Sequence, residues 1–192
     1  MTGRLMSDSK GFSDCGWLLQ ARKLPSPNYD SRPSSCQVEV VIMHAISLPP
    51  GQFGGHDIER FFLNELAADD HPYYKEIHAL KVSAHFLIRR TGEIIQFVSI
   101  KDRAWHAGVS SCRGREVVND FSVGIEFEGT DRTCFTESQY RSLQGLLQDI
   151  QCLYPHLNGE CLYGHSEIAP GRKTDPGSDF DWQRVRGMLN TW

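Results

Sequence analysis

Residues 121–128 constrain the fold more than any other part of the sequence, because apolar and polar residues alternate strictly along them. Successive side chains of a β-strand point to opposite faces of a sheet, so a period of two indicates a strand. One face carries Phe121, Val123, Ile125 and Phe127, and the other carries Ser122, Gly124, Glu126 and Glu128. The alternation therefore predicts a strand with one apolar core face and one polar face.

A second strand is predicted at residues 38–43, which are rich in β-branched side chains. Val38, Val40 and Ile42 lie on one face of such a strand, and the same alternation puts His44 on that side at its end. The pattern thus predicts a histidine at a strand terminus.

Three further stretches have the pattern of strands or sheet edges. Residues 82–89 and 93–98 predict a hairpin, in which Gly92 supplies the positive φ that such turns require. Residues 105–108 predict another edge, and residues 161–165 predict a short strand that ends in a second histidine.

Apolar residues at helical spacing predict helices at residues 16–24, 58–66 and 140–153 and from about residue 181 onward. Thr136 and Gln139 form a capping box before the third of these, which is a signal of a helix start. Strands interleaved with helices indicate an α/β fold, with a single mixed β-sheet flanked by helices. We expect one domain over residues 1–192.

The composition excludes several classes of protein. With 40% hydrophobic residues the chain can bury a core, and its formal net charge of −4 without a Lys or Arg run predicts no nucleic-acid partner. No stretch approaches the roughly 18 apolar residues of a membrane-spanning helix, so we expect no membrane span. Residues 1–14 form a polar extension without the apolar core of a signal peptide, which favours a cytoplasmic location.

The six cysteines do not have the spacing of a metal or redox motif. They are Cys15, Cys36, Cys112, Cys134, Cys152 and Cys161, and no two lie three positions apart as in a Cys-x-x-Cys pair. In a reducing compartment we expect free thiols.

Two histidines and one carboxylate suggest a metal site. His44 and His165 end separate strands, and Asp175 follows ten residues after the second. Three such ligands suit catalytic zinc and leave its fourth position open to water. Spacing alone is a weak argument, because a histidine at a strand end is more often an ordinary hydrogen-bonded polar residue and Asp175-Pro-Gly could be a simple turn.

Several long motifs resemble the zinc-dependent N-acetylmuramoyl-L-alanine amidases of the type-2 class, and most closely their cytosolic anhydromuramyl group. The matching stretches are Gly16-Trp-Leu, Pro25-Ser-Pro-Asn, Val82-Ser-Ala-His85 and residues 46–55, 103–111, 119–131 and 164–177. The resemblance covers about residues 16–185, in the family's order. It implies the amidase type-2 fold, similar to peptidoglycan-recognition domains.

The resemblance implies that His44, His165 and Asp175 bind Zn²⁺, that Glu126 accepts the proton of the attacking water, and that Lys173 stabilises the oxyanion. A carboxylate beside a catalytic metal is a natural general base, and an ammonium there lowers the barrier to a tetrahedral intermediate. The alternatives are a solvated strand face for Glu126 and a flexible surface lysine for Lys173.

Substrate contacts are predicted for Trp105, His106 and Ala107, and for Lys81 as a partner of a peptide carboxylate. An aromatic face can stack on a sugar, and the family uses this stretch for substrate. We expect His85 to be a buried, hydrogen-bonded structural residue or a neighbour of the metal ligands. The remaining histidines, His56, His71, His78 and His156, are expected on the surface or in loops. Ala45 and Val117 depart from the family, where Asn and Arg are expected.

The predicted function is hydrolysis of the amide between 1,6-anhydro-N-acetylmuramic acid and L-alanine of the stem peptide. The expected substrate is a small muropeptide, taken by a monomer during cytosolic peptidoglycan recycling, and removal of such fragments would lower a signal for β-lactamase induction. Three alternatives remain: an amidase acting on polymeric peptidoglycan, a fragment-binding module without turnover, and a thiol-based oxidoreductase or regulator.

Overall fold

The computed structural model describes residues 11–189. Its centre is a six-stranded mixed sheet in the order β1-β5-β4-β9-β3-β10. These strands are β1 (Arg22–Lys23), β3 (Val40–Ile46), β4 (Phe86–Ile88), β5 (Ile94–Gln96), β9 (Ser122–Glu128) and β10 (Leu162–Gly164). β4, β9, β3 and β10 are parallel neighbours, whereas β5 is antiparallel to β4 and parallel to β1. The predicted mixed sheet with flanking helices is confirmed.

The remaining elements surround this sheet. The helices are α1 (Asp57–Phe62), α2 (Tyr74–Ile77), α3 (Glu137–Leu153), α4 (His165–Ile168) and α5 (Trp182–Arg186), with 3-10 turns η1 (Val118–Phe121) and η2 (Gly159–Cys161). Two small antiparallel sheets pair β2 (Tyr29–Ser31) with β6 (Asp102–Ala104) and β7 (Ser111–Cys112) with β8 (Arg115–Glu116).

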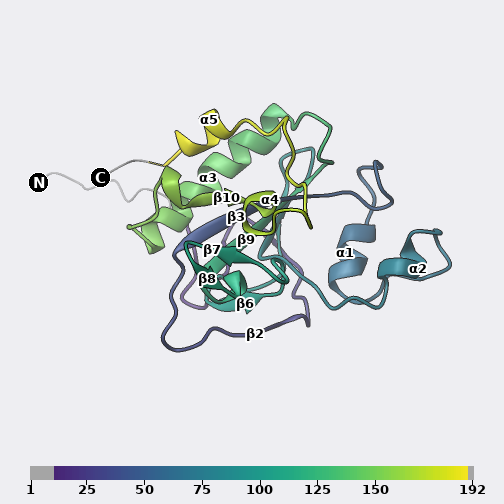
Figure 1. Ribbon diagram of the computed structural model, residues 1–192, viewed down its shortest axis with the longest axis horizontal. Coiled ribbons are helices and arrows are strands. Elements are labelled where there is room, and N and C mark those ends of the chain that lie inside the picture. Colours follow the sequence, from purple (N-terminus) through teal and green to yellow (C-terminus); the bar gives the residue numbers. More distant parts are fainter. Residues whose placement is uncertain (1–10, 190–192) are drawn as a thin grey trace, which may run out of the picture.

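One face of the sheet is covered by the long helix α3, with α5 beside it (Figure 1). The helix begins with the predicted capping box, because the Thr136 side chain accepts from the Gln139 N–H and the Gln139 side chain accepts from the Thr136 N–H. Its apolar stripe packs on alternate residues of β3 and β9. This cluster includes Val41, Met43, Val123, Ile125, Phe127, Leu143, Leu146, Leu147 and Ile150.

The opposite face is covered by two separate apolar clusters. One joins α1 to Leu87 and Ile95, and the other joins Val40 and Ile42 to the segment that leads into β9. A cleft whose lining includes Leu48, Phe61 and Phe62 of the first cluster lies on this side of the sheet. The sheet therefore has a continuous core on one face and a divided one on the face that carries His44.

The structure corrects four details of the sequence prediction. Residues 16–24 are not helical, because Gly16 has φ of +80° and the Leu18 N–H donates to the Gln96 side chain at 2.6 Å. Residues 105–108 form a loop after β6. The N–H groups of His106 and Ala107 donate to the Asn119 side chain rather than to a neighbouring strand. Val38 and Phe121 precede their strands and pack in the clusters opposite to those predicted.

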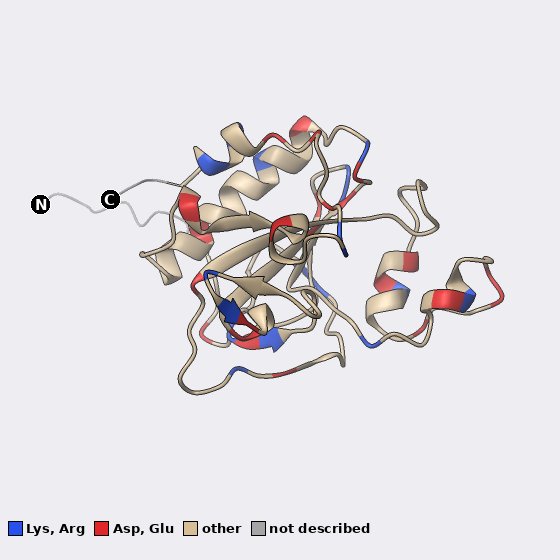
Figure 2. Ribbon diagram, in the orientation of Figure 1, with Lys and Arg blue, Asp and Glu red and all other residues tan. Residues whose placement is uncertain are grey.

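Acidic and basic residues are interspersed along the chain, as the red and blue segments of the ribbon show (Figure 2).

The polar face of β9 is buried rather than solvated at Glu128, which is 2% exposed and accepts from Arg89 at 3.0 Å. Arg89 also pairs with the buried Glu59 of α1, which binds Arg22 at 2.8 Å. This ion-pair chain connects α1 to the centre of the sheet.

The predicted extension over residues 1–14 lies mostly outside the described residues, as do residues 190–192, so the domain boundaries stay a prediction. Among residues 11–189, none of the helices has the length and hydrophobicity needed to span a bilayer. The described cysteines, Cys15 to Cys161, are all free thiols, as expected.

Candidate metal and catalytic site

The cleft of about 520 Å³ lies at the carboxyl ends of the parallel strands β3, β9 and β10. Its wall includes residues of α1 and α2 on one side and residues 165–175 on the other. Ligands of open sheets with parallel strands bind at this end, because the loops that follow the strands meet there.

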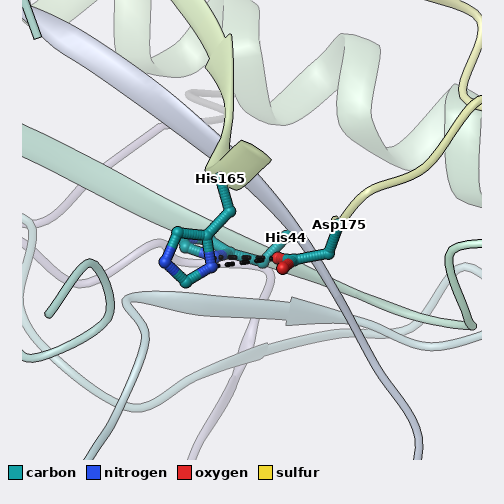
Figure 3. Close-up of side chains that lie close together, drawn as sticks. All are labelled: His44, His165 and Asp175. Carbon is teal, nitrogen blue, oxygen red and sulfur yellow. Dashed lines mark hydrogen bonds and ion pairs between the residues drawn. The ribbon is translucent and has the colours of Figure 1, made fainter. Parts of the chain in front are cut away.

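The three predicted ligands converge in this cleft (Figure 3). His44 is the fifth residue of β3, and His165 is the first residue of α4, directly after β10. Gly164 pairs with Met43 across the two parallel strands, and a histidine follows each of these residues. The two histidine rings therefore lie side by side. Asp175 reaches them from the following loop, whose backbone Asp175 C=O accepts from the Ser166 N–H at 2.9 Å.

The distances fit a tetrahedral metal site. His44 Nδ1 and His165 Nδ1 are 3.0 Å apart, and Asp175 Oδ2 lies 3.1 Å from His165 Nδ1 and 3.3 Å from His44 Nδ1. Ligands at the usual 2.0–2.2 Å from a tetrahedral zinc are separated by roughly 3.3–3.6 Å, so these atoms lie at or slightly inside that spacing. The three atoms are thus close enough to bind one ion, and two imidazoles with a carboxylate are a donor set that zinc accepts.

The protonation states also suit a metal. Burial lowers the pKa of His44 to about 4, against the opposing effect of the Asp175 carboxylate. Burial alone would raise the pKa of Asp175, but its hydrogen bonds with His165 and His44 hold that pKa well below its usual value. A neutral imidazole and an ionised carboxylate are the forms that bind metals.

Glu126 lies beside the ligands because it pairs in register with His44 in the neighbouring strand β9. It lines the cleft, and within residues 11–189 its buried Oε2 finds no hydrogen-bond partner. Burial raises the pKa of the carboxyl well above its usual value, and the nearby Asp175 charge raises it further. A half-buried carboxyl with an unsatisfied oxygen facing a metal site can accept a proton there.

Lys173 lines the same cleft but is exposed. Its charge opposes the rise in the pKa of Glu126, which places the ammonium within electrostatic reach of the site. Contact with a substrate oxygen stays a prediction.

The predicted substrate residues have different surroundings. Trp105 and His106 line the cleft, whereas Ala107 is fully buried and Lys81 lies outside the lining, between Leu80 and Val82 that belong to it. Their contacts with substrate remain predictions. His85 is buried and hydrogen-bonded, since its Nδ1 accepts from the Gly124 N–H at 3.0 Å.

Sequence reasoning predicted His106 only as a substrate residue and missed its contact with His44, and it missed Arg172 altogether. His106 Nδ1 lies 2.9 Å from His44 Nε2, and Arg172 donates to the Ala107 carbonyl at 2.7 Å beside His165. No spacing signal could reveal either contact, because both arise from loops that fold back over the sheet.

Residues 34–178 match the N-acetylmuramoyl-L-alanine amidase family, and this range contains the three predicted ligands and Glu126. The chain belongs to the N-acetylmuramoyl-L-alanine amidase family. The 1,6-anhydro-N-acetylmuramyl-L-alanine amidase AmpD of Salmonella typhimurium strain SL1344 is 50% identical over 176 residues, which are 92% of this chain and 94% of that protein.

Solved structures of this amidase family confirm the fold. The crystal structure of a Se-Met AmpD derivative matches with a TM-score of 0.89 and 50% identity, covering 92% of this chain and 98% of the other. The N-acetylmuramyl-L-alanine amidase AmiD from E. coli, in complex with the substrate anhydro-N-acetylmuramic acid-L-Ala-D-gamma-Glu-L-Lys, matches with a TM-score of 0.58. It is 29% identical and covers 81% of this chain and 59% of the other.

Proposed function

We propose that this amidase hydrolyses the amide bond between 1,6-anhydro-N-acetylmuramic acid and L-alanine of a muropeptide, with zinc held by His44, His165 and Asp175. Relatives of nearly full length that share half of its residues carry the name of this activity. The observation that carries the proposal is the pairing of Glu126 with His44 across β9 and β3, which puts an unsatisfied carboxyl oxygen beside three convergent metal-binding atoms.

Zinc at this site supplies Lewis acidity, which polarises the scissile carbonyl and makes water more acidic. Glu126 accepts the proton of the attacking water, because burial raises the pKa of its carboxyl and so makes it a stronger base than an exposed glutamate. The same carboxyl then returns the proton to the leaving amine of alanine.

Lys173 stabilises the negative charge that develops on the carbonyl oxygen. An ammonium next to a metal site adds positive charge at the place where the oxyanion forms. Its position in the lining of the cleft and its exposure let it approach a bound peptide from the solvent side.

We expect a small muropeptide, rather than an intact wall polymer, as the substrate. The complex of AmiD contains a single anhydromuramyl tripeptide, and the cleft of about 520 Å³ lies in the usual size range for small-molecule sites. Such fragments reach the enzyme during peptidoglycan recycling in the cytoplasm, where we place the protein as a monomer.

The test is incubation of the zinc-loaded protein with anhydro-N-acetylmuramyl tripeptide and, separately, with purified peptidoglycan. We expect free tripeptide with a new alanine amine from the first substrate, little release from the second, and loss of both after zinc removal by a chelator. Preferential cleavage of the polymer would favour a wall-degrading amidase. Tight binding without turnover would favour a fragment-binding module.

A further inference from the structure

One short segment, residues 105–107, contacts both histidines of the proposed metal site on the side away from Asp175. His106 Nδ1 lies 2.9 Å from His44 Nε2, and the Ala107 carbonyl lies 3.3 Å from His165 Nε2. Both rings direct Nδ1 toward Asp175, so the Nε2 atoms of His44 and His165 are the nitrogens that face residues 106 and 107. Two consecutive residues thus hold the outer nitrogen of each ligand.

The His106 ring is held by Ser122 and by its close approach to Gly124. Its Nε2 lies 3.0 Å from Ser122 Oγ, and Gly124 leaves the space for the ring, because a Cβ there would lie 2.6 Å from His106 Nδ1. When His44 offers Nδ1 to a metal, its Nε2–H donates to His106 Nδ1, and His106 Nε2–H donates to Ser122 Oγ. The position and tautomer of His44 are therefore fixed from β9.

The Ala107 carbonyl is held in place by Arg172, which bridges it to a second carbonyl. Arg172 Nη2 donates to it at 2.7 Å and also to the Val109 carbonyl at 2.7 Å. This bridge keeps the carbonyl directed at His165. Hydrogen-bonded partners of this kind orient metal-binding histidines and raise their basicity.

Asn119 holds the backbone of the segment. Its Oδ1 accepts from the N–H of His106 at 3.2 Å and from the N–H of Ala107 at 2.9 Å. Asn119 itself belongs to η1, and Arg32 Nη1 donates to its backbone carbonyl at 3.0 Å. The Asn119 side-chain oxygen thus holds the backbone of residues 106 and 107 in position next to the rings of His44 and His165.

We propose that Asn119 is a positioning residue for zinc, acting through His106 and the Ala107 carbonyl on His44 and His165. The proposal rests on the zinc site of the proposed function and adds a residue that touches neither metal nor substrate. It also gives residues 105–107 a role in addition to substrate contact.

The experiment measures the zinc dissociation constant of the full chain by competition with a chromophoric chelator. Asn119→Ala removes the acceptor, Asn119→Asp keeps it, and Asn158→Ala is the matched control, because the Asn158 side chain also accepts a backbone N–H but in η2. We expect the Kd to rise roughly 10- to 100-fold in Asn119→Ala and to change less than about 3-fold in the other two. Thermal unfolding of the metal-free variants separates a loss of stability from a loss of metal affinity.

An unchanged Kd in Asn119→Ala, or an equal rise in Asn119→Asp, would overturn the proposal. His106→Leu provides a second measurement if Asn119→Ala does not fold, because it removes the acceptor of His44 Nε2, and an unchanged Kd there would contradict the proposal as well. A wild-type protein that binds zinc but does not cleave muropeptide would refute only the proposed function. Absence of zinc binding by the wild type would refute both.

Discussion

Two carboxylates on the same face of β9 have opposite surroundings. Glu128 is 2% exposed and is satisfied by Arg89, by the Gly54 N–H at 2.6 Å and by the Arg90 N–H at 3.0 Å. Glu126 has a buried oxygen without a partner among the described residues. The hydrogen bonds of Glu128 give it a structural role. A buried carboxyl oxygen without a partner costs free energy of folding, and such groups are typical of functional sites, so we assign chemistry to Glu126.

Substitution of a proposed ligand separates the metal site from the thiols. We expect Asp175→Ala to lose zinc, because removal of one of three ligands leaves two nitrogens without the charge that balances the cation. Cys161→Ala should keep zinc, since Cys161 lies near Asn158 and the His156 carbonyl. Metal analysis after dialysis is the measurement, and the reverse result would move the site to the cysteines.

Lys173→Met tests the proposed oxyanion contact. We expect kcat to fall by roughly 10²- to 10³-fold, as for loss of one oxyanion donor. Zinc affinity should not weaken, because removing an ammonium from the rim relieves repulsion of the cation. A parallel loss of zinc would show instead that Lys173 supports the metal site.

At the scale of elements, the alternation predicted that Glu126 lies on the face of its strand opposite Val123 and Ile125, and the β-branched run before His44 predicted a histidine at a strand end. Their pairing in register needed the strand order, which no local pattern contains. The contacts of His106, Asn119 and Arg172 could not be predicted, because they join loops distant in sequence. The helix predicted at residues 16–24 failed because the Gln96 side chain binds the backbone of a turn there.

Two glycines provide a matched pair of element-scale substitutions. Gly124→Ala places a Cβ against the His106 ring, so we expect displacement of that ring, a loss of stability and weaker zinc binding. Gly145 of α3 has no atom within 4 Å of a Cβ, so Gly145→Ala should stabilise the helix by about 0.5–1 kcal/mol. Urea unfolding and zinc titration check both. Equal effects of the two substitutions would contradict the packing described for His106.

At the scale of the whole molecule, the divided core explains where the site lies. α3 closes one face of the sheet with a continuous cluster, while α1 and the segment before β9 cover the other face in two parts. The rings of His44, His85 and His106 are buried and lie next to one another at this site. Their burial couples the stability of the metal-free protein to pH.

The metal-free protein should lose stability as the pH falls from about 6.5 toward 4. Burial lowers the pKa of His44 to about 4 and that of His85 to about 3. Between pH 6.5 and 4 these histidines therefore bind protons in the unfolded chain but stay largely neutral in the folded one. Each such histidine contributes a slope of about 1.4 kcal/mol per pH unit in this range, and Glu126, whose pKa is raised, acts in the opposite direction. Urea unfolding between pH 7 and 4.5 measures the slope.

His85→Gln is the control for this pH dependence. It should reduce the slope by about 1.4 kcal/mol per pH unit, because it removes one titrating group without introducing another. An identical slope in the variant would mean that His85 does not remain neutral in the folded protein.

The most direct test of the account is Glu126→Gln, measured for both zinc content and hydrolysis of anhydro-N-acetylmuramyl tripeptide. Glutamine keeps the shape of the side chain but cannot accept the proton of water. We predict one zinc per chain as in the wild type and a fall in kcat of roughly 10²- to 10⁴-fold. Full activity in the zinc-loaded variant would contradict the assignment of Glu126 as the proton acceptor.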